Sequence, residues 1–256
     1  MRRNIVLSAA AIIISLASSF LSAAEPSPKR FVALNAKAGA IGDLIDLLKV
    51  TEIGADVAKD FAPKLQSGDI RIVDLTKKVR KDYEIPRNEI ARFDLGTARV
   101  YVDFDQEAGL LAPVLLHELV HAVDPALSAT KEKLESLYDE KERLAVARAK
   151  SGLDRAEKAR LKGQLEKARS DYESFRQLRM FKSERKAFDA EFAFRKQLWT
   201  KVPGYLPYLQ SKEAATGTRL TENPSDEELM SLYQIDPGIL SKALQEERSS
   251  SSSAGR

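Results

Sequence analysis

The amino-acid sequence predicts an α+β fold that is mostly helical and contains a small mixed sheet. Three observations lead to this prediction. Short alternating apolar segments in the first half of the chain indicate strands. One segment near the middle is apolar almost all round, as a buried central helix should be. The stretch 129–201 is dominated by Lys, Glu, Arg, Ala and Leu, a composition that favours long helices.

In the first half of the chain, apolar spacing predicts short strands and helices. Phe31–Leu34, Ile70–Leu75 and Thr97–Phe104 have the pattern of strands. The last is the clearest, because its apolar side chains alternate along the segment. Helical spacing is found over Ile41–Leu48 and again over Val57–Leu65.

The central helix is expected to span about twelve residues and to stop near Asp124. Pro113 fits a first helical turn, where its missing N–H costs nothing. Pro125 cannot continue a helix, so the segment must stop before it. The near-continuous apolar surface predicts that this helix lies inside the domain.

The stretch 129–175 predicts a helical hairpin inserted into the domain. Apolar residues at helical spacing continue on both sides of a turn at Ser151–Asp154. We expect the two arms to pack antiparallel, or to form a coiled-coil arm that projects from the domain. Its charged face is interpreted as a solvated surface, and binding of a protein partner is the alternative role.

Beyond Trp199 the sequence indicates a loop followed by two short helices. The loop, Val202–Tyr208, contains proline and tyrosine. The helices are expected to begin near Pro224, where the sequence is typical of a capped N-terminus, and near Pro237. The tail 247–256 is rich in serine and is predicted to be disordered.

The first 24 residues have the pattern of a cleavable export signal. A short basic segment, Met1–Asn4, precedes an apolar run over Ile5–Leu21. Ser22 and Ala24 then occupy the −3 and −1 positions of a signal peptidase site. The run is short and interrupted by serine, which argues against a membrane anchor. We therefore expect a mature chain that starts near Glu25, is periplasmic or secreted, and has no stable membrane insertion.

Composition narrows the class of protein further. Lysine and arginine total 41 residues against 38 acidic residues, with the two signs interspersed, so the sequence shows no footprint for binding nucleic acid. The chain has no cysteine, so it forms no disulfide even in an oxidising compartment. Its stability must come from burial of a core and from any bound metal.

The segment His117–His121, with the sequence His-Glu-Leu-Val-His, contains the only two histidines of the chain. Two histidines four residues apart on a helix project from one face, so both imidazoles can reach a single Zn²⁺. Glu118 would take a proton from metal-bound water as this water attacks a peptide carbonyl. The alternative is a buried helix with two core histidines, in which two imidazoles and a carboxylate would all need partners.

A catalytic zinc usually has three protein ligands and a water, so a third ligand is needed. With no cysteine and no further histidine, this ligand must be a carboxylate. Asp124 lies seven residues after His117 on the same helix face, but at the helix end. Glu184 and Glu191 share one face of a later predicted helix. The residue pattern leaves all three carboxylates open.

The segments His117–Asp124 and Ser183–Ala187 resemble the gluzincin metallopeptidases. That family combines a His-Glu-x-x-His helix with a glutamate ligand on a later helix. The stretch His117–Asp124 is similar in particular to the zinc helix of the anthrax lethal factor group. In that group the third ligand lies in a Ser-Glu-x-x-Ala stretch, which Ser183–Ala187 matches.

The resemblance implies a zincin-like domain and assigns a role to each motif residue. His117, His121 and Glu184 would bind one Zn²⁺, and Glu118 would be the general base. Asp124 would hold an imidazole N–H in place or close the helix.

An enzyme of this kind also needs a donor for the developing oxyanion, often a tyrosine or a histidine. Because no histidine is left, Tyr205 and Tyr208 are the candidates. The resemblance further implies that the strand Thr97–Phe104 is the edge strand that pairs with an extended substrate.

The sequence therefore predicts an exported zinc metallopeptidase that hydrolyses peptide or protein substrates. Its expected parts are a signal peptide over 1–24, a zincin-like domain over 25–128 and 176–246, a hairpin insertion over 129–175, and a disordered tail over 247–256. The alternative is an exported binding or scaffold protein with a structural or vestigial metal site and a partner-binding helical arm. A metal-binding but inactive relative is a third possibility.

Overall fold

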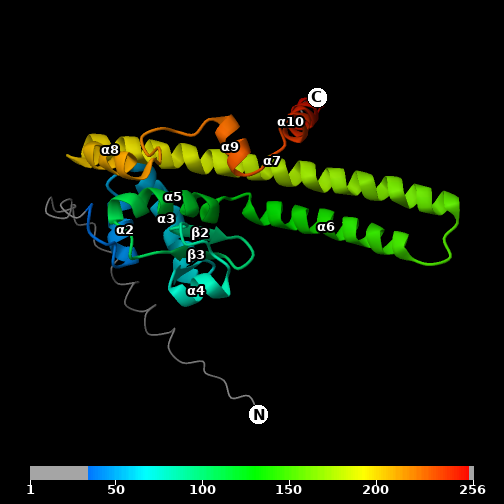
Figure 1. Ribbon diagram of the computed structural model, residues 1–256, viewed down its shortest axis with the longest axis horizontal. Coiled ribbons are helices and arrows are strands. Elements are labelled where there is room, and N and C mark those ends of the chain that lie inside the picture. The colour runs from blue at the N-terminus through cyan, green and yellow to red at the C-terminus, as the bar shows by residue number, and fades with distance from the viewer. Residues whose placement is uncertain (1–33, 254–256) are drawn as a thin grey trace, which may run out of the picture. The chain divides into compact units, whose positions relative to one another are not determined.

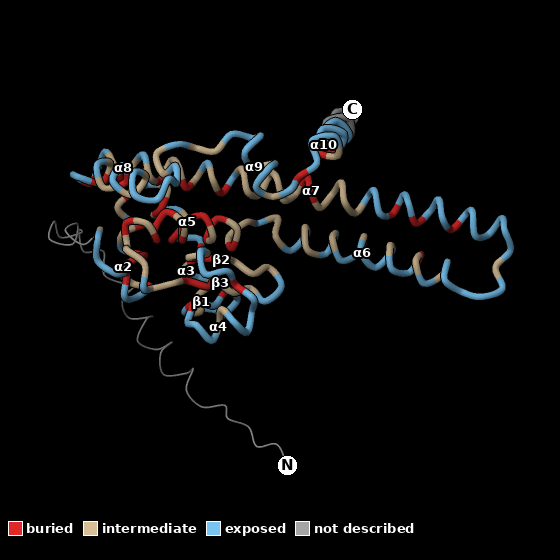
Figure 2. Tube along the Cα trace, in the orientation of Figure 1, coloured by how far each residue is buried: buried red, intermediate tan, exposed pale blue. Residues whose placement is uncertain are grey.

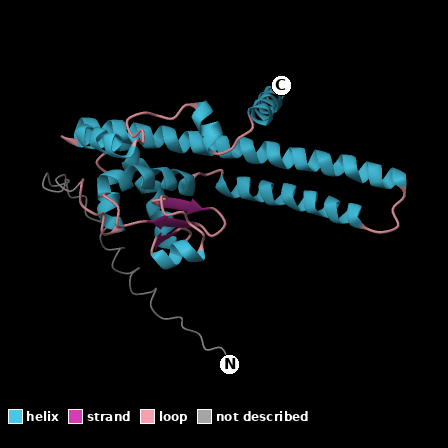
Figure 3. Ribbon diagram, in the orientation of Figure 1, coloured by secondary structure: helices cyan, strands magenta, loops and turns pink. Residues whose placement is uncertain are grey.

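In the computed structural model, residues 34–253 are described, and they form a mostly helical α+β fold with a three-stranded mixed sheet (Figure 1 and Figure 3). The predicted fold class is thus confirmed. The predicted export signal over 1–24 lies outside the described residues, as does most of the predicted strand Phe31–Leu34. Leu34 itself is in a turn.

The chain divides into two compact units. One comprises the chain up to Val123 together with Ala190–Glu222, and the other comprises Asp124–Asp189 together with the chain from Asn223. This division differs from the expected domain boundaries because the second arm of the hairpin and the predicted glutamate helix are a single element. Helix α7 (Arg155–Lys201) is continuous over 47 residues and contributes to both units.

The first unit combines the sheet with five complete helices and the end of α7. Its complete elements are α2 (Ile41–Leu48), α3 (Glu52–Ser67), β1 (Arg71–Asp74), α4 (Lys77–Asp82), β2 (Ala91–Asp94), β3 (Arg99–Val102), α5 (Ala108–Val123) and α8 (Tyr205–Thr216). The predicted helices at 41–48 and 57–65 and the strands at 70–75 and 97–104 are confirmed within these bounds. Helix α4 and strand β2 have no counterpart among the predicted elements.

The sheet has the order β1-β3-β2. Strand β3 pairs in parallel with β1 and antiparallel with β2. The prediction that Thr97–Phe104 provides the edge strand is therefore wrong, because both sides of β3 already have partners. The edge next to α5 belongs to β2, which is only four residues long and contains the charged side chains of Arg92 and Asp94.

Helix α5 lies in the core of the first unit. Ten of its residues are buried, and Figure 2 shows this helix as an almost continuous buried segment. It packs against α2, α3 and the strands β2 and β3. The helix ends at Val123, as Pro125 predicts.

Pro113 lies inside α5, and the prediction that it falls in the first turn is wrong. The helix begins at Ala108, so Pro113 is its sixth residue. A proline there leaves the carbonyl four residues earlier, that of Gly109, without its helical donor. The buried hydroxyl of Tyr205 donates to this carbonyl at 3.0 Å. A side chain from α8 thus replaces the missing backbone hydrogen bond.

The segment predicted as a loop at Val202–Tyr208 is in large part the start of α8. Gly204 precedes this helix with φ 84°, a left-handed conformation that glycine adopts without strain. Pro207 falls in the first turn, where its missing N–H costs nothing. The prolines therefore mark the beginning of a helix.

The second unit contains the helical hairpin and two further helices. Helix α6 (Leu127–Ala149) and the first part of α7 are joined by a turn at 150–154, as predicted. Helix α9 (Asp226–Leu232) begins with a capping box formed by Ser225 and Glu228. Helix α10 (Pro237–Ser253) packs on the middle of α7 through a cluster that includes Leu178 and Leu240.

The predicted disorder of the tail 247–256 is wrong up to Ser253, because α10 extends that far. The last described turns are serine-rich and continue a helix that is already formed, which needs no new nucleation. Among residues 34–253, no single helix has the length and apolar character for a membrane span, and only α5 and α6 taken together, bent by 68° at their junction, meet that test.

The link between Pro113 and Tyr205 gives a first prediction. Tyr205→Phe should destabilise the protein by about 1–3 kcal/mol, because it leaves the buried Gly109 carbonyl without a donor. In a Pro113→Ala background the same change should cost less, since residue 113 then supplies the helical N–H. Chemical denaturation of the unmodified protein, the two single variants and the double variant measures this coupling. An equal loss of unfolding free energy in both backgrounds would show that the Tyr205 hydrogen bond does not compensate for the N–H that Pro113 lacks.

Candidate metal centre

The two histidines of α5 bring their Nε2 atoms together. His117 is buried and His121 is partly exposed, one helical turn further along. Their Nε2 atoms lie 3.2 Å apart. Two nitrogen ligands at 2.0–2.1 Å from one tetrahedral ion would be about 3.3 Å apart. The observed spacing therefore fits two imidazoles that share a metal ion.

The other ring nitrogen of His117 contacts Glu191 on α7. Glu191 Oε2 lies 3.0 Å from Nδ1, and both side chains are buried. An ionised carboxylate can only accept a hydrogen bond, so the proton must be on Nδ1. In the neutral imidazole this leaves the lone pair on Nε2, the atom that faces His121. Glu191 thus orients His117, and its predicted alternative role as a ligand is not supported.

Glu184 completes a group of three potential metal ligands. One ligand atom from each of His117, His121 and Glu184 lies within 4.8 Å of the others. Glu184 and Glu191 are seven residues apart on the continuous helix α7, so they lie two turns apart on one face. The group of His117, His121 and Glu184 could hold a metal ion, with Glu184 as a ligand, while Glu191 fixes the imidazole of His117.

Asp124 lies outside this group. Its Oδ1 accepts a hydrogen bond from the backbone N–H of Ala126 at 3.2 Å and faces Lys186 Nζ at 3.4 Å. Both contacts belong to the turn that follows α5 and to the helix beside it. Asp124 closes the helix end, one of the two roles expected of it.

Glu118 connects α5 to the edge of the sheet. Its Oε2 accepts a hydrogen bond from the backbone N–H of Phe93 in β2 at 2.6 Å. The N–H of Asp103 donates to the carbonyl of Ile90, which sets the alternation of the β2–β3 ladder. The N–H and C=O of Ala91 and Phe93 consequently point away from β3, toward the outer edge of the sheet. The carboxylate of Glu118 therefore lies at this edge, where it binds the N–H of Phe93.

Tyr205 and Tyr208, the predicted oxyanion donors, are engaged elsewhere. The Tyr205 hydroxyl donates to the Gly109 carbonyl, and the Tyr208 hydroxyl donates to Glu107 at 2.6 Å. Both acceptors lie near the first turn of α5, roughly 12 Å along the helix axis from the histidines. The structure therefore contradicts the predicted role of these two tyrosines.

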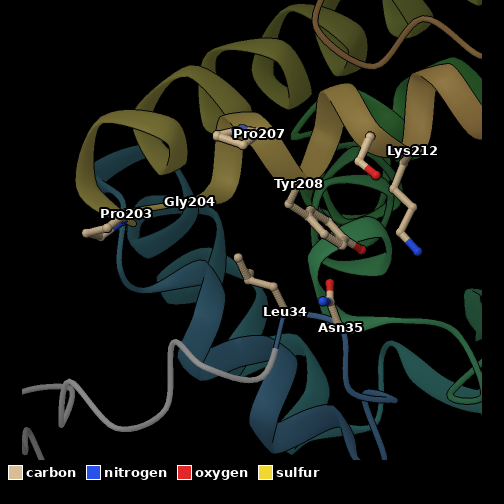
Figure 4. Close-up of a pocket in the computed structure, with 8 residues that line it drawn as sticks. Leu34, Asn35, Pro203, Gly204, Pro207, Tyr208 and Lys212 are labelled. Carbon is tan, nitrogen blue, oxygen red and sulfur yellow. The ribbon is translucent and has the colours of Figure 1, made fainter.

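The surroundings of Tyr208 explain its fixed position. Burial raises the pKa of the Tyr208 hydroxyl above its usual range, and the hydrogen bond to Glu107 adds to this. Burial also raises the pKa of Glu107, but hydrogen bonds from Lys212 and Tyr208 outweigh it and leave that pKa lowered. Tyr208 and Lys212 line a cavity of about 430 Å³ beside the start of α8, together with Leu34, Asn35, Pro203, Gly204, Pro207 and Ser211 (Figure 4).

Two features of the centre were not found from the sequence. Phe93 acts through its backbone, which no side-chain pattern reveals. Arg195 pairs with Glu191 on the same helix, and the side chain of Glu191 is buried while that of Arg195 is 11% exposed. Their spacing of four residues was a usable signal, but such pairs occur all along this charged helix, as at Lys162 and Glu166.

The chain was compared with known protein families, with curated proteins and with solved structures, and nothing matches it.

Proposed function

We propose that this protein is an exported zinc-dependent peptidase whose centre is formed by His117, His121 and Glu184. The observation that supports this most strongly is the joint position of three potential ligand atoms beside Glu118. The two Nε2 atoms have the spacing expected of two nitrogens that bind one metal ion. Glu118, the residue after His117, has its carboxylate at the edge of the sheet.

Zinc is the metal favoured by this donor set. Two imidazoles and one carboxylate are a known ligand combination for catalytic zinc, with a water in the remaining position. Among the described residues, the nearby carboxylates Asp124 and Glu191 have other partners, which favours an open fourth position. A bound zinc would polarise the substrate carbonyl and lower the pKa of its water.

Glu118 is the proposed general base. The Phe93 N–H holds one oxygen of its carboxylate, which fixes the orientation of the side chain. The carboxylate accepts a proton from the attacking water, whose oxygen forms a bond to the peptide carbonyl carbon. The same proton then passes to the leaving nitrogen as the C–N bond breaks. Glu118 thus begins and ends the cycle ionised.

The proposed substrate is a peptide segment in extended conformation. It would pair with the outward N–H and C=O groups of Ala91 and with the outward C=O of Phe93 on β2, since the Phe93 N–H is already bound to Glu118. Recognition of this kind uses main-chain hydrogen bonds, so it depends little on substrate sequence. The export pattern at 1–24 would place this activity in the periplasm or outside the cell.

A second function, binding of a protein partner through the hairpin, is favoured by exposed side chains on α6. Tyr138 and Val146 on this helix are 46% and 62% exposed. Lys141 lies over the rings of Tyr138 and Tyr172 at 4.1 and 5.0 Å, which holds the aromatic pair in place. In this alternative, metal is bound without peptide cleavage.

Metal binding tests the proposed ligands. The mature chain should bind one zinc ion, and Glu184→Ala should weaken the affinity by about tenfold or more because it removes a ligand. Asp124→Asn should leave the affinity nearly unchanged, since Asp124 has its partners in the turn after α5. Elemental analysis and competition with a chelator measure both. Unchanged affinity in Glu184→Ala would assign the third ligand to another carboxylate, and no zinc under replete conditions would contradict the proposal.

Peptide cleavage tests the role of Glu118. Glu118→Gln should lower kcat by roughly 100-fold or more, since the amide cannot accept the proton from water. Its zinc content should stay at one per chain. Glu140→Gln is the matched control, because Glu140 is exposed on α6 and pairs with Arg143. Mass spectrometry of a peptide mixture provides the rates. Zinc without cleavage in the unmodified chain would favour the partner-binding function.

A further inference from the structure

A buried chain of polar contacts leads from His117 away from the potential metal ligands. Glu191 holds Nδ1 of His117 with one carboxylate oxygen and the guanidinium of Arg195 with the other. The side chains of Glu191 and Arg195 are 6% and 11% exposed. Arg195 also donates to the backbone carbonyl of Leu220 at 3.1 Å. These residues all belong to the first unit.

The far end of this chain is anchored as well. Glu213, near the end of α8, accepts hydrogen bonds from the backbone N–H groups of Leu220 and Thr221 and from the Thr221 hydroxyl. Hydrogen bonds from Thr221 and the nearby charge of Arg195 lower the pKa of Glu213, so it remains an ionised acceptor. The Leu220 carbonyl is thereby held in place, and the guanidinium that it binds has a fixed position.

We propose that Arg195 is a positioning residue for His117, although it contacts neither the potential metal ligands nor the substrate edge. It holds Glu191 in the rotamer that keeps the imidazole proton on Nδ1 and leaves the Nε2 lone pair facing His121, where a metal ion would be bound. Contacts of this kind behind a ligand imidazole govern metal affinity as well as ring orientation. The inference rests on the proposed metal centre. It adds that His117 is held in place by contacts that run from the segment Leu220–Thr221 through Arg195 and Glu191.

Arginine is suited to this position and lysine is not. The planar guanidinium presents separate N–H groups, so NH2 can bind Glu191 while NH1 binds Leu220. An ammonium group on a flexible stem can keep the charge beside Glu191 but does not span both partners in one plane. Without either cation, a buried carboxylate has lost its charge partner and is no longer fixed in one rotamer.

Helix α7 supplies a matched control at Arg185. This arginine also pairs with a carboxylate four residues away, Asp189, and donates to a backbone carbonyl, that of Pro224. Asp189 contacts Asn223 rather than an imidazole. Substitution of Arg185 therefore removes a comparable set of contacts and leaves the contacts between Arg195, Glu191 and His117 unchanged.

The first experiment measures zinc affinity by chelator competition in the full mature chain. Arg195→Met should weaken zinc binding by about 10–100-fold, and Arg195→Lys should fall between this variant and the unmodified protein. Arg185→Met should leave the affinity nearly unchanged. Circular dichroism at the same temperature verifies that each variant is folded. Equal losses in Arg195→Met and Arg185→Met, or no loss in either, would overturn the proposal.

The second experiment needs no metal. Because the chain contains two histidines, ¹⁵N-labelled histidine gives two sets of imidazole signals. At a pH where both rings are neutral, the signals of His117 should report a proton on Nδ1 and none on Nε2. Arg195→Met should shift His117 toward a mixture of tautomers, and Arg195→Lys should restore the single form only in part. An unchanged tautomer in Arg195→Met would also overturn the proposal.

These readouts separate the inference from the proposed peptidase activity. If zinc affinity and the His117 tautomer respond to Arg195 while no peptide is cleaved, the positioning role stands and the peptidase function fails. If peptides are cleaved through Glu118 while Arg195→Met binds zinc with unchanged affinity, the peptidase function stands and the positioning role fails.

Discussion

The contact between His117 and Glu191 is the interaction on which the candidate centre depends. A helix as apolar as α5 can be buried cheaply, but an imidazole within it needs a partner for each ring nitrogen. Glu191 satisfies one nitrogen, and its own buried charge is matched by Arg195. The other nitrogen, Nε2, faces His121 Nε2 at 3.2 Å. The requirement to satisfy buried polar atoms thus produces the same arrangement that metal binding requires.

The same requirement explains why α5 tolerates a proline. Pro113 interrupts the hydrogen bonding of the helix in its most buried part, and Tyr205 restores the missing donor from a neighbouring helix. Gly109 also leaves room for the second tyrosine, since a Cβ at that position would lie 2.7 Å from the ring of Tyr208. The two tyrosines predicted as oxyanion donors thus contact the start of the helix instead.

Much of the fold could be predicted because several elements have strong periodicity. The apolar run before His117 and the spacing around Leu44 and Phe61 identify helices whatever their neighbours. Strand β2 could not be predicted, since four residues with two charges carry no period and owe their conformation to pairing with β3. The histidines were predicted from spacing, whereas Glu184 was one of three carboxylates that spacing left open and was assigned only through the family resemblance. The roles of Phe93 and Arg195 were not, because they depend on contacts between segments far apart in the chain.

Helix α7 is one uninterrupted helix that forms an arm of the hairpin and also contributes residues to the candidate centre. It begins as an arm of the hairpin, and its later turns carry Glu184, Glu191 and Arg195. Each residue of an α-helix advances by about 100°, so an inserted residue between Glu184 and Glu191 would rotate one carboxylate away from the other. An insertion at the hairpin tip, before Arg155, leaves this angular phase intact. The arm can therefore change length at its tip during evolution while the carboxylates keep their alignment. The number of residues before Arg155 is free to vary, whereas the number between Glu184 and Glu191 is not.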